Sequence, residues 1–204
     1  METLRIYIID DDIRRYKIMA TYFEAVKADI SSEKTQTHEG FTELLKKLGI
    51  EKIDLYHIRG KATPSDDSDF LDYSYDEDFE NDIKKILDDN SPRFFLLDLA
   101  LNKQERDIFS RNENMLVPYV ARQIVDLIGQ QSSRKELIVV NTRCTNLSRR
   151  LEKVLDIKSS VKKRLYVKII SANIFAPTYV REQKDIILGA TVKDFLEELK
   201  KENG

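Results

Sequence analysis

Carboxylates stand at the ends of two apolar segments of the sequence, where they could hold a metal ion or act as nucleophiles. Residues 4–9 are followed directly by three aspartates at 10–12, and residues 94–97 are followed by Asp98. Oxygen ligands of this kind suit Mg²⁺. A carboxylate beside Mg²⁺ can attack phosphorus and form an aspartyl phosphate. The residues therefore point to cation binding and phosphoryl chemistry, provided that the fold brings them together.

Predicted strands and helices alternate along the chain. Five segments predict strands, at residues 4–9, 53–58, 94–97, 137–140 and 165–170; the first is rich in β-branched residues, the second is more polar and the third is the most apolar. Apolar residues at helical spacing predict helices, around residues 16–26, 41–48, 79–87, 118–128, 147–155 and 191–199. We expect Gly49 to cap the second helix, and Thr191 with Asp194, in capping-box spacing, to open the last one. This alternation predicts a doubly wound α/β fold with a parallel sheet covered on both faces.

In such a fold, ligands bind outside the carboxyl ends of the strands. If the strand order is 2-1-3-4-5, the aspartates at 10–12 and Asp98 converge at one edge, where they repel one another unless a cation neutralises them. Thr142 follows the fourth strand and could hydrogen-bond a phosphoryl oxygen. Helix capping is an alternative explanation for one or two of the adjacent aspartates, because an acid at the start of a helix offsets its dipole.

Composition excludes several other classes of protein. The chain has 204 residues, and no apolar segment approaches the ~18 residues that a membrane-spanning helix needs. The single cysteine, Cys144, argues against a disulfide framework and a multi-cysteine zinc site. The two histidines are far apart in the sequence, which argues against a His-rich metal site. No glycine-rich turn follows the first strand, which argues against a dinucleotide site or a P-loop. Because no signal-peptide pattern opens the chain, we expect a cytoplasmic protein without a membrane partner.

Charge is unevenly spread along the chain, although 34 basic residues nearly balance 36 acidic ones. Residues 62–83 hold nine acids and no base, and we expect an acidic loop there. Residues 143–168 hold nine bases and two acids, but only Tyr166 could stack on a base. The sequence therefore does not favour nucleic acid as a partner.

Three segments resemble the motifs of a known family. Residues 6–12 read Ile-Tyr-Ile-Ile-Asp-Asp-Asp and precede an amphipathic helix, residues 95–101 read Phe-Leu-Leu-Asp-Leu-Ala-Leu, and residues 137–142 read Leu-Ile-Val-Val-Asn-Thr. They resemble, in order, the opening strand, the phosphoacceptor strand and the hydroxyl-bearing strand of the receiver domain of bacterial response regulators. The resemblance touches most of the chain, through short motifs.

The resemblance implies a role for each matched residue. It implies a Mg²⁺ site whose ligands are Asp10, Asp11, Asp98 and the backbone carbonyl of Ala100. It also makes Asp98 the phosphoacceptor and Thr142 the switch hydroxyl. Lys168 is the nearest match to the family's catalytic lysine, although it stands before the end of the fifth predicted strand.

We therefore expect one receiver-like domain over residues 1–204, with five parallel strands in the flavodoxin-like order 2-1-3-4-5. The acidic loop at 62–83 and an insert at 102–115 would enlarge it. It would accept a phosphoryl group in a two-component phosphorelay, with a sensor histidine kinase or another signalling protein as its partner. Its only enzymatic activity would be formation and hydrolysis of the aspartyl phosphate. The sequence does not indicate an oligomeric state.

Two alternatives stay open. Asn102 stands where receivers usually have proline, and Arg143 stands where they have a small residue. These departures favour a degenerate receiver that acts as a protein–protein interaction module without phosphotransfer. The second alternative is a haloacid-dehalogenase-like phosphatase, because Asp10 and Asp12 also fit the Asp-x-Asp that ends the first strand of that family.

Overall fold

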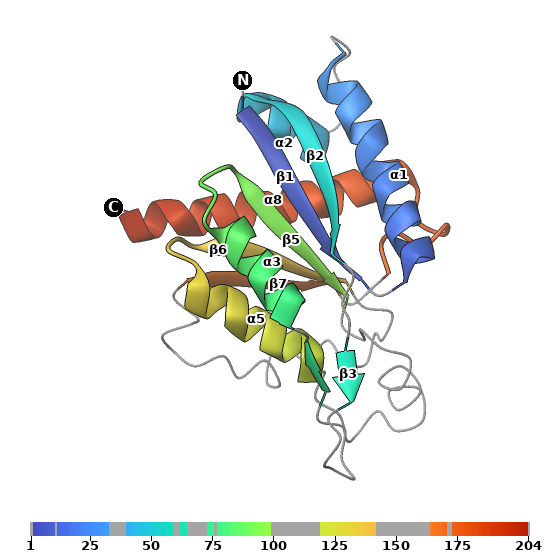
Figure 1. Cartoon of the computed structure of the whole chain (residues 1–204). Coiled ribbons are helices and arrows are strands. Elements are labelled where there is room, and N and C mark those ends of the chain that lie inside the picture. The colour runs from blue at the N-terminus through green and yellow to red at the C-terminus, as the bar shows by residue number, and fades with distance from the viewer. Residues whose placement is uncertain are drawn as a thin grey trace.

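A parallel sheet of five strands lies at the centre of the structure, and helices cover both of its faces (Figure 1). The computed structural model describes residues 2–10, 12–32, 40–58, 62–64, 73–75, 77–98, 119–141, 164–170 and 173–203. No helix among these residues combines the length and the apolar character needed to cross a bilayer.

The order of the strands agrees with the sequence-based prediction. The sheet consists of β1 (Glu2–Ile9), β2 (Ile50–Ile58), β5 (Arg93–Asp98), β6 (Glu136–Asn141) and β7 (Leu165–Ile170). Their spatial order is β2-β1-β5-β6-β7, and every neighbouring pair is parallel. Counted along the chain, this order is 2-1-3-4-5. The predicted doubly wound α/β fold is confirmed.

Each face of the sheet forms its own core. One face is covered by α1 (Ile13–Ile30), α2 (Phe41–Lys47) and α8 (Arg181–Asn203), and the other by α3 (Glu77–Leu87) and α5 (Tyr119–Gln131). Successive side chains of a strand point to opposite faces. Ile8 therefore packs in the core with α1, whereas Ile9 packs in the core with α3 and α5.

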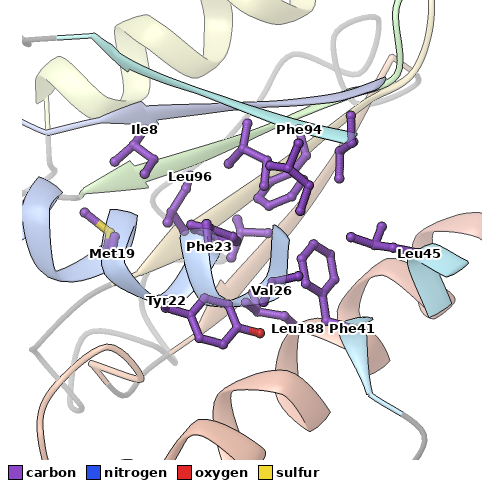
Figure 2. Packing of buried hydrophobic residues seen from close by; sticks show 14 of the residues in the cluster. Ile8, Met19, Tyr22, Phe23, Val26, Phe41, Leu45, Phe94, Leu96 and Leu188 are labelled. Carbon is purple, nitrogen blue, oxygen red and sulfur yellow. The ribbon is translucent and has the colours of Figure 1, made fainter. Parts of the chain in front are cut away.

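Phe23 of α1 lies at the centre of the core that α1, α2 and α8 form with the sheet (Figure 2). It is fully buried, and its ring centroid is 6.2 Å from that of Phe41 in α2 and 6.2 Å from that of Phe94 in β5. Aromatic pairs at ~4.5–7 Å contribute about 0.5–1.5 kcal/mol beyond the area that they bury. These contacts fix α1 and α2 against the strand that ends at Asp98.

A buried carboxylate of α8 holds the start of α2. Asp185 accepts hydrogen bonds from the backbone N–H and the hydroxyl of Thr42, at 3.1 and 2.8 Å, and from the hydroxyl of Tyr22, at 3.2 Å. The N-cap residue of α2 is Gly40, which has no side chain to cap the helix. Asp185 therefore supplies the negative group that a helix start favours. Burial raises the pKa of the Tyr22 hydroxyl well above its ordinary value.

The last helix begins earlier than predicted. α8 starts at Arg181, and Thr191 lies buried inside it, with its hydroxyl donating to the carbonyl of Ile187. The prediction that Thr191 opens this helix is therefore wrong. At the observed start, the side-chain carbonyl of Gln183 accepts a hydrogen bond from the N–H of Val180, at 3.1 Å. This contact is one half of a capping box.

Part of the predicted acidic loop is regular structure. β3 (Ala62–Pro64) and β4 (Tyr73–Tyr75) form a small antiparallel sheet, which Figure 1 places beyond the carboxyl ends of the main strands. The prediction of a loop is thus wrong at these two strands, and α3 begins inside the same acidic range. Gly49 follows α2 with a φ of 73°, as expected for a helix-ending glycine. The helix predicted at 147–155 lies outside the described residues.

A buried ion pair closes the amino edge of the sheet. Arg93 at the start of β5 donates to Glu136 at the start of β6 from Nε and Nη2, at 3.1 and 2.7 Å, and both side chains are 1% exposed. The same guanidinium donates to the carbonyls of Ile86, Leu87 and Asp89 at the end of α3. Charge-assisted bonds of this kind are among the strongest in proteins. Arg93 therefore ties α3 to two central strands.

Replacing Arg93 should destabilise the fold strongly. In Arg93→Met, Glu136 stays buried with less compensation for its charge, so the free energy of unfolding should fall by about 3–5 kcal/mol. Urea denaturation measures the change. The matched control is Lys84→Met, which removes an exposed ion pair with Glu80 and should cost less than about 1 kcal/mol. Equal losses in the two variants would contradict a structural role for the buried pair.

Adding one methyl group at Gly189 should destabilise the protein, although alanine is the better helix former. A Cβ on Gly189 would lie 2.6 Å from the backbone nitrogen of Phe41 in α2. We expect Gly189→Ala to lower the free energy of unfolding by about 1–3 kcal/mol, as overpacking does. The control is Ala190→Gly, because Ala190 is the next residue of the helix and is exposed. It measures helix propensity alone and should lower the free energy of unfolding by about 1 kcal/mol. A stabilised Gly189→Ala protein would show that α8 and α2 are not in close contact.

Candidate functional site

Two carboxylates and one guanidinium meet at the carboxyl edge of the sheet. Arg15 of α1 lies with Nη2 3.1 Å from Oδ1 of Asp10, and the same nitrogen donates to Oδ2 of Asp98. The side chains of Asp10, Asp98 and Arg15 are 3%, 10% and 15% exposed. The predicted convergence of Asp10 and Asp98 therefore occurs, because β1 and β5 are neighbours in the sheet. The cation between them belongs to the chain itself.

The turn from β1 into α1 places Arg15 in this position. The N–H of Asp12 donates to Oδ1 of Asp10 at 2.7 Å, and the carboxylate of Asp12 accepts from the N–H of Arg14 at 2.9 Å. Asp12 is thus the N-cap of α1, as the capping explanation of the aspartate run expects. Capping fixes the first turn of α1, and the Arg15 side chain then reaches back over the strand ends.

His57 and Tyr16 support the same turn from the edge strand. Nε2 of His57 lies 2.9 Å from the backbone carbonyl of Asp10, and the N–H of Asp10 donates to the carbonyl of Ile58 at 3.2 Å. The imidazole stacks on the ring of Tyr16, with 4.2 Å between ring centroids. The end of β2 therefore holds both the backbone of Asp10 and the first turn of α1.

A small pocket of about 70 Å³ adjoins the carboxylates. Asp10, Arg15 and Asp98 line it together with Asn141, at the end of β6, and Asn173. Nδ2 of Asn141 lies 3.4 Å from Oδ1 of Asn173. The pocket has room for water or a small polar group. The polar groups that line it are two carboxylates, one guanidinium and two side-chain amides.

Other predicted site residues are placed elsewhere or lie outside the described residues. Lys168 stands in the middle of β7, and its Nζ lies 3.4 Å from Oδ2 of Asp194 in α8. The structure therefore gives Lys168 a partner on α8 and does not place it at the end of its strand. Asp11, Ala100 and Thr142 fall outside the described residues.

Among the described residues, the group that bridges Asp10 and Asp98 is a guanidinium. The Arg15 guanidinium already bonds both carboxylates. Within the described part of the chain, no group of three or more His, Cys, Asp or Glu side chains could hold a metal ion. Arg15 was not predicted from the sequence. Its only signal is its place on the first turn of a helix that follows an acidic strand end, which many surface arginines share.

Comparison of the sequence with protein-family models, with curated proteins and with solved structures found no match. The function must therefore be inferred from the fold and from this group of side chains.

Removing the guanidinium should create a response to Mg²⁺ that the wild-type protein lacks. In Arg15→Met the two carboxylates lose their cation, so the free energy of unfolding should fall by about 3 kcal/mol. Millimolar Mg²⁺ should then raise the melting temperature of the variant by mass action. It should leave the wild-type melting temperature nearly unchanged.

Arg14→Met is the matched control, because Arg14 is exposed on the same turn of α1. Its stability should stay within about 0.5 kcal/mol of wild type, and Mg²⁺ should not change its melting temperature. A wild-type protein that Mg²⁺ stabilises as much as it stabilises Arg15→Met would contradict the assignment of Arg15 as the resident cation.

Proposed function

We propose that this chain is a receiver-like signalling module that acts through protein–protein contact without phosphotransfer. The observation that carries the proposal is the pair of ionic contacts from Arg15 to Asp10 and Asp98. A phosphorylatable receiver would place an exchangeable divalent cation between these carboxylates. Arginine stays protonated at every physiological pH, so this site keeps its cation under all such conditions.

Further features agree with a receiver-like interaction module. The strand order is that of the flavodoxin-like fold, which agrees with the receiver resemblance but carries no chemistry by itself. Lys168, the candidate for the lysine that would contact a phosphoryl group, is engaged with Asp194 on α8. The departures at Asn102 and Arg143 in the sequence point in the same direction.

A second candidate function is an aspartyl-phosphate acceptor in a two-component phosphorelay that uses Mg²⁺. The pocket of about 70 Å³ beside Asp98 favours it, because a small group could approach the carboxylate there. A sensor histidine kinase would then be the partner. This function requires Arg15 to leave at least one of the two carboxylates.

A phosphatase of the haloacid-dehalogenase type has less support. In such an enzyme the second aspartate of Asp-x-Asp would act on the substrate. Here the carboxylate of Asp12 accepts a hydrogen bond from the N–H of Arg14 and caps α1.

Incubation with acetyl phosphate and Mg²⁺ separates the two receiver functions. We expect the intact mass of the wild-type protein to stay unchanged, because the guanidinium holds Asp98 and occupies the place of the divalent cation. Arg15→Met should gain up to one phosphoryl group, and Arg15→Met/Asp98→Ala should gain none. Intact-mass spectrometry measures all three proteins.

Asp98→Ala in the wild-type background is the control for modification elsewhere in the chain. A wild-type protein that gains one phosphate, which Asp98→Ala does not gain, would replace the interaction-module proposal with the phosphoacceptor function.

A further inference from the structure

A second pocket opens at the amino edge of the sheet, at the opposite end from Asp10 and Asp98. It has a volume of about 280 Å³ and lies between α2 and α8. Leu4, Phe94 and Leu137, near the starts of three strands, line it from the sheet. This pocket shares no residue with the pocket beside Asp98.

The volume of about 280 Å³ is far above that of a packing defect and close to the lower end of the range for ligand sites. Native cores leave few voids larger than a water molecule, whereas ligand pockets begin at about 300 Å³. At ~30 Å³ for each water-sized group, the pocket holds on the order of nine such groups. Apolar side chains of α8 that stay partly exposed form one wall: Val192, Phe195, Leu196 and Leu199. Leu48, which follows α2, is 41% exposed at the same pocket.

Basic side chains line one side of this apolar pocket. Glu136 pairs with both Arg93 and Arg134, so the charged part of the lining carries three basic residues, Arg93, Arg134 and Lys135, against one carboxylate. The side chain of Lys135 is only 6% exposed, and its Nζ lies 2.6 Å from Oε1 of Glu198. Lysine is rarely buried this deeply unless it is paired.

A carboxylate of a ligand can replace the carboxylate that pairs with Lys135, because the latter belongs to an exposed side chain. Glu198 stands on α8 with 44% of its side chain exposed. The side chain of Arg134 is 34% exposed, and its guanidinium donates to Glu136 and to the backbone carbonyls of Asn90 and Ser91. These contacts use three of its five N–H donors, and the geometry of the group suits a further carboxylate. A ligand carboxylate could therefore take the place of Glu198 at Lys135 and reach Arg134 as well. An apolar chain attached to it would cover the exposed wall of α8.

We propose that this pocket binds a single-chain amphiphilic carboxylate of medium length. The apolar chain of the ligand lies between α2 and α8 on the amino edge of the sheet, and its carboxylate bonds Lys135 and Arg134. The volume sets the length of the chain, and the two cations set the charge of its head group. The proposal does not depend on the function of Asp98.

Decanoate and decanol, below their aggregation concentrations, test the proposal on the full chain. Calorimetric titration should give one decanoate for each protein molecule, and decanoate should raise the melting temperature. Decanol lacks the charge that Lys135 and Arg134 recognise, so its affinity should be lower than that of decanoate by a factor of about ten or more. Lys135→Met should weaken decanoate binding by a similar factor without changing decanol binding. Lys52→Met, an exposed site on β2, is its control.

Filling the pocket should abolish binding. Leu196→Trp places a large ring at its wall, and Ile186→Trp places the same ring at an exposed site on α8 that does not line it. Decanoate should bind Ile186→Trp as it binds wild type, and it should not bind Leu196→Trp. Circular dichroism checks folding, and Val192→Trp replaces Leu196→Trp if that protein does not fold.

Three results would overturn the proposal. The first is no saturable binding of decanoate, and the second is equal affinity for decanoate and decanol. The third is self-association in sedimentation experiments that Leu196→Trp removes, because the occupant would then be a second copy of the chain.

Discussion

Two carboxylates at neighbouring strand ends, Asp10 and Asp98, lie close together and almost fully buried, with the Arg15 guanidinium between them. Without a cation, two buried charges of the same sign would repel each other and lose their solvation. The contact also has a geometric effect, because Arg15 belongs to α1 whereas the carboxylates belong to the ends of β1 and β5. The first turn of α1 is therefore held against the sheet at the place where a ligand would enter.

The opposite edge of the sheet is organised by ionic contacts as well, but with different consequences. Arg93 bonds Glu136 and a backbone carbonyl at the end of α3, and all of these groups lie inside the protein. This pair therefore stabilises the fold. Lys135 instead pairs with an exposed carboxylate of α8, Glu198. A pair with one exposed member is screened and can exchange its partner. The amino edge therefore combines a fixed ionic contact with an exchangeable one.

The sequence predicted the parts of the structure that depend on local pattern. The apolar segments ending at Ile9 and Leu97 identified strands, and the alternation with helices predicted the fold in which Asp10 and Asp98 meet. It did not predict Arg15, because nothing in the spacing of a helical arginine tells which strand end its side chain reaches. Likewise, Arg93 and Glu136 are far apart in the sequence and resemble the solvated charges that flank many strands.

The wrong start of α8 has a tertiary cause. Gly189 and Thr191 read as a break followed by an N-cap, since glycine weakens helices and threonine favours caps. In the structure the helix continues through both, and the missing side chain at Gly189 lets the backbone of Phe41 in α2 approach closely. The hydroxyl of Thr191 bonds the carbonyl of Ile187 one turn earlier. Gly189 therefore serves the contact with α2, which no local pattern encodes, and does not mark a break in the helix.

A cation that belongs to the chain behaves differently from one taken from solution. The occupancy of an exchangeable ion follows its concentration, whereas a tethered group acts at a fixed effective concentration, in the millimolar range or above for short linkers. Arg15 also brings one positive charge to two carboxylates, so these three side chains keep a net negative charge. A tethered guanidinium therefore holds the turn around Asp10 and the first turn of α1 without a divalent ion from solution. This supports the proposed interaction module over a phosphorylation switch, because a switch needs two states that a ligand can bias.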